Sequence, residues 1–192
     1  MVIFITGGSG SGKSEYAEQR AVWCREQLEK KSPGSETELI YIATMEPMDA
    51  ESRARIERHR NMRAAKHFTT CECYTHLEEL VLKEAGSEKQ NIVLLECLSN
   101  LMTNEMFSSK GRNDSVVSTI KQGINHLIEQ SRDVIIVGNN VFEDGIQYDE
   151  TTEVYLKQMA ELHCALAEQA DEVIEVICGI PLFWKGGKHE VH

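Results

Sequence analysis

Short apolar runs alternate with longer amphipathic stretches along most of the chain. Runs rich in β-branched and aliphatic residues predict buried strands at 2–6, 39–44, 91–97, 133–137 and 172–178. Weaker patterns predict short strands at 67–70 and, at the edge of a sheet, 179–185. Apolar residues at helical spacing predict helices at 74–85, 98–107, 114–130 and 151–169, and one that begins near Lys13. Asp49 is an expected N-cap of a further helix that reaches about Ala65.

This alternation predicts an α/β fold with a mainly parallel sheet and helices on both faces. The length of 192 residues fits a single domain, 1–192, with a substantial core. In such sheets ligands bind beyond the carboxyl ends of the strands. The search for chemistry therefore concentrates on 7–14, 43–46, 96–100 and 138–147.

A glycine-rich stretch joins the first strand to the first helix. It reads GGSGSGKS and fits the pattern G-x-x-x-x-G-K-[ST]. The residues are Gly7, Gly8, Ser9, Gly10, Ser11, Gly12, Lys13 and Ser14. Such a loop binds phosphates through backbone N–H groups and the positive end of the following helix. Lys13 would reach the β- and γ-phosphates, and Ser14 would ligate Mg²⁺. The alternative, a plain Gly/Ser-rich turn, leaves the complete match unexplained.

The helix expected after Asp49 carries five arginines within eleven positions, against an acidic background. Arg55, His59 and Arg63 are spaced to share one face of that helix. Guanidinium groups bind phosphate oxygens, and a neutral imidazole between them is a candidate nucleophile toward phosphorus. The competing interpretation is a solvated helix with Glu/Arg pairs and a surface histidine.

Two acidic residues lie at or just after the carboxyl ends of predicted strands. Glu96 ends the apolar run IVLLE, where a carboxylate of the Walker-B type would hold Mg²⁺ directly or through water. Glu72 follows the short strand predicted at 67–70 and is uninformative by itself.

The charge and composition of the chain disfavour some classes of binding partner. The net charge is −11 and the isoelectric point is about 5.1, which disfavours general nucleic-acid or membrane-surface binding. The longest apolar runs are too short for a membrane span, and the N-terminal run lacks the basic region of a secretion signal, so a cytoplasmic location is expected. The six cysteines include no CxxC pair and are expected to be reduced and structural.

Together these motifs resemble the bifunctional adenosylcobinamide kinase/adenosylcobinamide-phosphate guanylyltransferase family of cobalamin synthesis. The matching segments are GGSGSGKS at 7–14, YIAT at 41–44, RIERHRNMR at 55–63, TCE at 70–72 and ECL at 96–98 with TN at 103–104. The C-terminal segments ADEV at 170–173 and GIPLFWK at 179–185 match more loosely. The resemblance spans nearly the whole chain.

The resemblance implies a fold, an activity and a set of site residues. It implies a P-loop fold of the RecA kind, a homotrimer, and ATP or GTP as nucleotide substrates. His59 corresponds to the histidine that receives GMP from GTP and passes it to adenosylcobinamide phosphate, while the kinase half phosphorylates adenosylcobinamide. Besides the P-loop, the positions that correspond to nucleotide contacts are Ala43, Thr44, Met45, Arg60, Asn61, Met62, Arg63, Glu72 and Glu96.

The region after the strand at 133–137 departs from the family pattern. Asn140 stands where the family usually has glutamate, and the following helix keeps only an aromatic residue, Tyr155, of an expected Arg-x-aromatic-Arg-Asp pattern. The expected consequence is altered acceptor binding or a weakening of one of the two activities. Two alternatives to the bifunctional enzyme therefore stay open at this point: a P-loop kinase of another small alcohol, and a nucleotide-binding module without catalysis.

Overall fold

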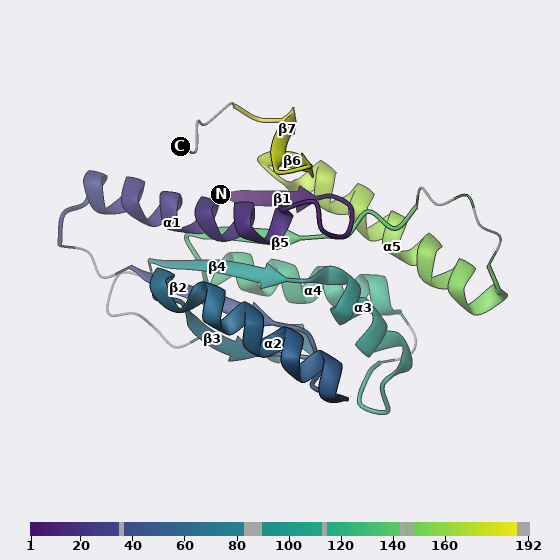
Figure 1. Ribbon diagram of the computed structural model, residues 1–192. Coiled ribbons are helices and arrows are strands. Elements are labelled where there is room, and N and C mark those ends of the chain that lie inside the picture. Colours follow the sequence, from purple (N-terminus) through teal and green to yellow (C-terminus); the bar gives the residue numbers. More distant parts are fainter. Residues whose placement is uncertain (35–36, 83–89, 113–114, 143–144, 146–147, 188–192) are drawn as a thin grey trace.

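The computed structural model describes residues 1–34, 37–82, 90–112, 115–142, 145 and 148–187, without the side chains of Glu51, Arg55 and Met62. Its strands form one sheet in the order β3-β2-β4-β5-β1-β6-β7 (Figure 1). The first six strands along the chain are parallel, and β7 pairs antiparallel with β6. The strands are β1 (Val2–Thr6), β2 (Glu38–Ala43), β3 (Thr69–Glu72), β4 (Asn91–Glu96), β5 (Asp133–Val137), β6 (Glu172–Ile177) and β7 (Ile180–Lys185).

Helices cover both faces of the sheet. One face carries α1 and α2, and the other carries α3, α4 and α5 (Figure 1). The helices are α1 (Lys13–Lys31), α2 (Ala50–Arg63), α3 (Leu98–Phe107), α4 (Val116–Glu129) and α5 (Glu150–Gln169). Two short 3-10 turns, η1 (Ala64–Lys66) and η2 (Leu77–Glu79), complete the described helical elements.

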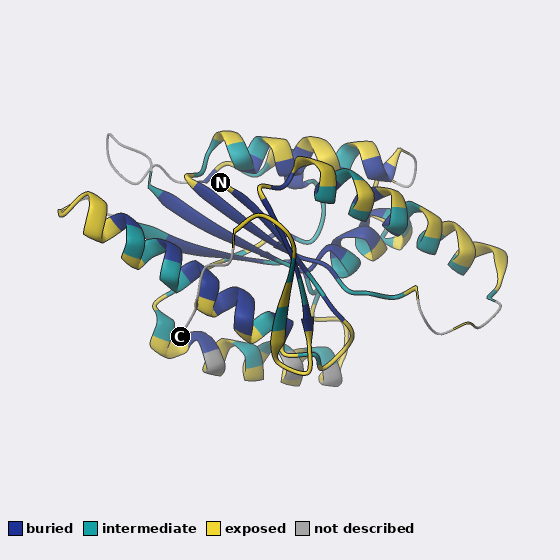
Figure 2. Ribbon diagram, turned by 90° about the horizontal axis from the view of Figure 1, so that it is seen from above, coloured by how far each residue is buried: buried dark blue, intermediate teal, exposed yellow. Residues whose placement is uncertain are grey.

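The core has two layers because successive strand residues point to opposite faces. Ile3 and Ile5 of β1 pack with Ala17 and Ala21 of α1, whereas Phe4 packs with residues of α3, α4 and α5. The central strands are buried on both faces, which is why they read as continuous apolar runs. Figure 2 shows these buried strands enclosed between the helices.

A buried ion pair fixes α1 against the sheet. Arg20 donates two hydrogen bonds, of 2.9 and 2.7 Å, to the carboxylate of Glu172 at the start of β6. The guanidinium also lies 4.2 Å from the centre of the Trp23 ring. Since α1 begins within the glycine-rich loop, this contact helps to fix the direction in which the helix leaves that loop.

Most of the predicted architecture is confirmed. The helix 98–107 and the strands 2–6 and 133–137 have the predicted bounds, and β7 is the predicted edge strand. The parallel sheet with helices on both faces is confirmed as well. Among the helices that the structure describes, none is long and apolar enough to cross a bilayer.

The helix predicted at 74–85 is wrong over its described part. Residues 74–82 hold only the 3-10 turn η2, and 83–85 lie outside the described residues. Tertiary contacts take the hydrogen-bonding groups that a helix would use. The N–H of His76 donates to Glu105 (2.6 Å), and the side-chain amide of Gln130 bonds the N–H of Leu82 and the carbonyl of Leu80.

The strand predicted at 67–70 is shifted by two residues. His67 has a positive φ of 59°, in the left-handed region, so it ends η1 and cannot extend along a strand. As a result β3 runs from Thr69 to Glu72, and Glu72 lies at its carboxyl end rather than beyond it.

Candidate functional site

The glycine-rich loop leaves β1 and enters α1 at the carboxyl edge of the sheet (Figure 1). Gly10 and Gly12 have φ values of 71° and 90°, which residues with a Cβ rarely adopt. The N–H of Tyr16 donates to the carbonyl of Gly12 (3.0 Å), which starts the helical ladder of α1 at once. The N–H groups at the start of α1 therefore lie next to the loop, as anion binding requires.

Neighbouring segments hold the loop on both sides. The N–H of Asn140, after β5, donates to the carbonyl of Gly7 (3.0 Å), and the N–H of Gly179, between β6 and β7, donates to the carbonyl of Ser11 (2.8 Å). At Gly7 a Cβ would lie only 2.5 Å from the carbonyl oxygen of Val176. Glycine at this position lets the loop pack directly against the sheet edge.

Lys13 lies inside the loop. Its side chain is buried, and Nζ donates a 3.0 Å hydrogen bond to the carbonyl of Gly8. The ammonium group is thus held in the concave side of the loop. Together with the helix N-terminus, it provides positive charge for a polyphosphate.

Ser14, at the start of α1, contacts Glu96 at the end of β4, although β5 lies between β4 and the strand β1 that leads into α1. The Ser14 hydroxyl donates to Oε1 of Glu96 (2.5 Å), and the Tyr41 hydroxyl donates to Oε2 of the same carboxylate (3.1 Å). A hydroxyl and a carboxylate beside a phosphate-binding loop are oxygen donors of the kind that Mg²⁺ prefers. The two residues predicted as metal ligands are therefore in contact with each other.

The ends of β2 and β4 are joined by buried hydrogen bonds. The Thr44 hydroxyl donates to the carbonyl of Cys97 (2.8 Å) and accepts from its N–H (2.7 Å). Asn104 of α3 donates to the carbonyls of Thr44 and Tyr74, both at 2.9 Å. The polar atoms of Thr44 thus hold the carboxyl ends of two strands in place. Its predicted nucleotide contact, like that of Ala43 and Met45, stays a prediction.

Two of the predicted nucleotide-contacting residues, from different elements, form an ion pair at the edge of the sheet where β3 lies. Arg60 of α2 donates to Oε1 of Glu72 (2.6 Å), and the Tyr74 hydroxyl donates to Oε2 (2.8 Å). Burial, together with the hydrogen bond to Glu72, raises the pKa of Tyr74 to about 12, so its hydroxyl remains a donor at neutral pH. All three side chains are at least partly exposed to solvent.

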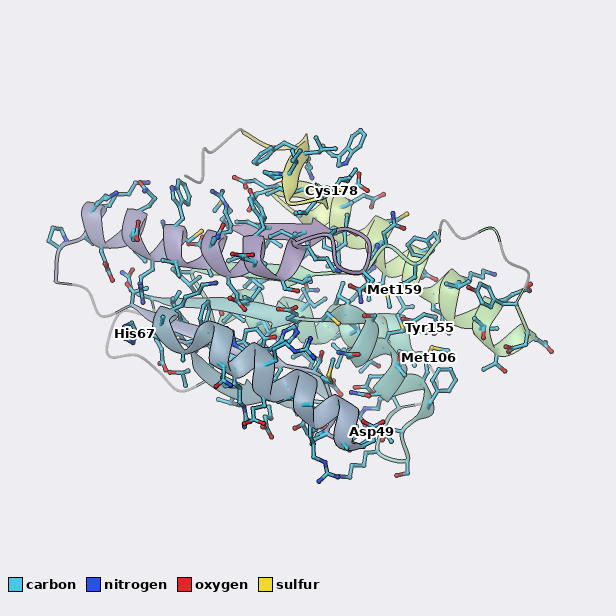
Figure 3. All side chains as sticks on the ribbon, viewed as in Figure 1. Asp49, His67, Met106, Tyr155, Met159 and Cys178 are labelled. Carbon is cyan, nitrogen blue, oxygen red and sulfur yellow. The ribbon has the colours of Figure 1, made fainter. Side chains whose placement is uncertain are left out.

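The histidine helix exists as predicted, but its arginines are not equivalent. His59 is half-buried on α2, whose ends lie near the labelled residues Asp49 and His67 (Figure 3). Arg63, one turn later, is buried, and its guanidinium lies 3.4 Å from the centre of the Tyr41 ring. Arg60 and Asn61 are exposed, and the side chains of Arg55 and Met62 lie outside the described part. That two guanidiniums flank the imidazole of His59 stays a prediction.

The segments after β4 and β5, together with α5, hold polar groups and an aromatic cluster. Asn139 donates to the Ser99 hydroxyl (2.6 Å), which lies 3.0 Å from the Cys97 thiol. Further along α5, the ring of His163 packs edge-on against Phe4 and Phe142, with centroids 5.0 and 5.4 Å away. In Figure 3 the labelled residues Tyr155 and Met159 show the direction of α5 beside Met106 of α3.

The half-buried ring of His163 predicts a pH dependence of stability. Burial lowers the pKa of His163 to about 4, below the usual 6.5, so folding favours the neutral ring. The free energy of unfolding should therefore fall by about 1–3 kcal/mol as the pH drops from 6.5 to 4. Urea unfolding at several pH values would measure this. A His163→Leu variant should lose that part of the slope, and an unchanged slope would contradict the assignment.

Sequence reasoning missed two residues of the site. Tyr41 and Asn104 entered only as letters in family motifs, although they bond Glu96 and Thr44 respectively. The available signal was a phenol inside the aliphatic run LIYIAT, because a buried tyrosine hydroxyl usually has a polar partner.

Comparison with known proteins gives the family. The model of the cobinamide kinase/cobinamide phosphate guanyltransferase family, CobU, matches residues 3–183. Two curated relatives carry the name "Bifunctional adenosylcobalamin biosynthesis protein CobU". The protein from Salmonella typhimurium is 30% identical over 94% of this chain and 97% of its own, and the one from Escherichia coli is 31% identical over the same shares.

A third relative is the "Bifunctional adenosylcobalamin biosynthesis protein CobP" of Pseudomonas aeruginosa. It is 29% identical over 95% of this chain and 96% of its own. The match thus includes the P-loop, the histidine helix and the altered region after β5. The chain belongs to the cobinamide kinase/cobinamide phosphate guanyltransferase family.

Proposed function

We propose that this chain catalyses two successive reactions in one domain. The first phosphorylates the aminopropanol hydroxyl of adenosylcobinamide with ATP or GTP. The second transfers GMP from GTP to adenosylcobinamide phosphate, giving adenosylcobinamide-GDP. The observation that carries the proposal is the phosphate loop with Lys13 inside it and the Ser14–Glu96 contact at its edge. The family assignment favours this interpretation over a kinase of another alcohol or a binding module without catalysis.

In the kinase reaction the loop holds the nucleotide, and the substrate hydroxyl attacks its γ-phosphorus and displaces the nucleoside diphosphate. The hydroxyl oxygen forms a bond to the γ-phosphorus, the bond from that phosphorus to the bridging β-phosphate oxygen breaks, the nucleoside diphosphate leaves, and the hydroxyl proton passes to solvent. Lys13 and the N–H groups at the start of α1 lie where they stabilise the phosphate charge. Ser14 and Glu96 would hold Mg²⁺, which neutralises part of that charge when it is bound.

In the transferase reaction His59 acts as the nucleophile. A ring nitrogen attacks the α-phosphorus of GTP, a P–N bond forms, and pyrophosphate leaves as the P–O bond breaks. A phosphate oxygen of adenosylcobinamide phosphate then attacks the same phosphorus, and the P–N bond breaks to restore the imidazole. Arg60 and Asn61 would contact the nucleotide during the two displacements, and Met62, Arg63 and Glu72 belong to the same proposed binding surface.

Further properties of the protein belong to the proposal. The substrates are adenosylcobinamide and its phosphate, with ATP or GTP and Mg²⁺ as the other components. A homotrimer in the cytoplasm is proposed from the family resemblance. The acidic net charge of −11 fits a small-molecule enzyme better than a nucleic-acid binder.

One labelling experiment separates the three candidate functions. The purified chain is incubated with Mg²⁺ and GTP labelled at the α-phosphate, and the protein is tested for label that is lost in acid and kept in base. Turnover of adenosylcobinamide is measured in parallel with ATP and with GTP. The proposal predicts both the labelled chain and phosphorylated adenosylcobinamide.

The other outcomes reject specific parts of the proposal. Phosphorylation without any labelled protein would leave a kinase alone and remove the transferase half. A chain that binds nucleotide but neither becomes labelled nor turns over adenosylcobinamide would be a binding module.

A further inference from the structure

Tyr41 lies between the carboxylate proposed to hold Mg²⁺ and the helix that carries His59. It belongs to β2, and its side chain is buried. Its hydroxyl contacts Glu96, and its ring contacts Arg63 of α2. We propose that Tyr41 is a positioning residue that orients Glu96 for the metal–nucleotide complex and seats the carboxyl end of α2. This inference rests on the proposed function.

The Tyr41 hydroxyl donates the second of two hydrogen bonds that hold the Glu96 carboxylate. Ser14 occupies Oε1 and Tyr41 occupies Oε2, so hydrogen bonds from opposite sides fix the rotation of the carboxylate. Without the tyrosine hydroxyl, Oε2 would lose its donor, and the carboxylate, held only by Ser14, could turn more easily about its last bond. A carboxylate that can turn binds a metal less tightly, because its rotation then has to be restricted when the metal binds, and this costs conformational entropy.

The ring of Tyr41 holds the guanidinium of Arg63 in position. The guanidinium lies 3.4 Å from the ring centre, well within the range of a cation–π contact, and the side chain is 4% exposed. Its Nε and Nη1 have no hydrogen-bond partner among the described residues. The aromatic face therefore stabilises this buried cation, together with the charge of the nearby Glu18 carboxylate, and helps to fix Arg63 in the last turn of α2.

The two contacts link the two chemical groups of the proposed enzyme. His59 precedes Arg63 by one helical turn, about 6 Å along the axis of α2. One side chain thus touches both the anchor of the nucleophile helix and the carboxylate beside the P-loop. A second contact also holds this end of α2: the ion pair of Lys66 with Glu18 (2.5 Å) joins the turn after α2 to α1.

A buried tyrosine with a purely structural role is the alternative to exclude, and the chain contains a suitable comparison. Tyr16 is also buried on the α1 side of the sheet, but its hydroxyl has no hydrogen-bond partner in the described part of the chain. Tyr41 packs in addition against the edge of Phe68, with ring centroids 6.2 Å apart. Replacing each tyrosine by phenylalanine keeps the ring and removes only the hydroxyl.

The test measures metal and nucleotide binding separately. Wild type, Tyr41→Phe and Tyr16→Phe are each titrated with Mn²⁺ in the presence of GDP. The electron paramagnetic resonance signal of free Mn²⁺ gives the affinity for the metal. The affinity for GDP is measured separately in the absence of metal. Tyr41→Phe should bind Mn²⁺ about tenfold more weakly, the value of one hydrogen bond to a charged group. Its metal-free GDP affinity and the behaviour of Tyr16→Phe should stay within about twofold of wild type.

A further variant tests the ring. Tyr41→Leu removes the hydroxyl and the aromatic face, so it should show the same Mn²⁺ defect and also a slower rate of protein labelling by α-labelled GTP. Tyr41→Phe should label at a rate closer to wild type when Mn²⁺ is saturating. Equal labelling rates in the two variants would overturn the role of the ring.

The outcomes distinguish this inference from the proposed function. A wild-type chain that binds no Mn²⁺–GDP removes the proposed function and the inference with it. A wild type that binds normally, with Tyr41→Phe identical to it, overturns the inference alone. Equal weakening of metal-free and metal-dependent binding in Tyr41→Phe shows a structural tyrosine and also overturns it.

Discussion

A His59→Ala variant is expected to lose protein labelling by α-labelled GTP and to transfer GMP at least about 10³-fold more slowly than wild type. The reason is chemical, since alanine offers no atom that can bond to phosphorus, and the two-step displacement then has no covalent intermediate. Phosphorylation of adenosylcobinamide should stay within about threefold of wild type, because the kinase reaction needs the P-loop and not the imidazole. Scintillation counting of the precipitated protein and separation of the corrinoid products provide the two measurements.

The matched control is another histidine. His126 is partly buried on α4, which covers the opposite face of the sheet. His126→Ala should label and turn over like wild type. Label that persists in His59→Ala would show that a different residue carries GMP, and equal loss of both activities would show a folding defect rather than a missing nucleophile.

Local patterns were sufficient to predict most of the sheet. The strands at 91–96 and 133–137 are buried on both faces, so each is a continuous apolar run with little ambiguity. The segment 74–82 misled the same reasoning because its apolar residues have helical spacing, while its backbone bonds the side chains of Glu105 and Gln130. Those partners are distant in the sequence, and no local rule predicts them.

The candidate site likewise has one part that local sequence patterns predict and another part that they do not. The loop at 7–14 is a local structure whose glycines and lysine act within a few residues, so its sequence is sufficient to recognise it. The pairing of Arg60 with Glu72 and of Tyr41 with Glu96 depends on which strands are neighbours in the sheet. Strand order is a tertiary property, and the predicted strand at 67–70 even placed Glu72 outside the sheet.

The burial of Arg63 illustrates the limit of helical spacing. Spacing alone placed Arg55, His59 and Arg63 on one face and gave both arginines the same role. In the structure the face that includes Arg63 packs on the sheet, and the guanidinium lies over the Tyr41 ring. Arg63 therefore belongs to the proposed binding surface from a buried position, whereas Arg60 is exposed and paired with Glu72 of β3.

A Lys13→Ala variant is expected to lose both activities, each by at least about 10²-fold. Lys13 is buried within the loop, and its ammonium group lies 3.0 Å from the carbonyl of Gly8, so no other described lysine occupies the same position. Kinase turnover and GTP labelling are measured as for His59→Ala. Lys121→Ala, at an exposed position of α4 on the opposite face of the sheet, is the control and should retain both activities within about threefold.

The two variants together decide whether one nucleotide site serves both reactions. If the P-loop cradles the GTP that guanylylates His59, removing Lys13 must abolish labelling although the imidazole is intact. A Lys13→Ala chain that still becomes labelled, while its kinase activity is lost, would place that GTP outside the loop. The histidine helix would then have a nucleotide site of its own, built from α2 and the Arg60–Glu72 edge rather than from the glycine-rich loop.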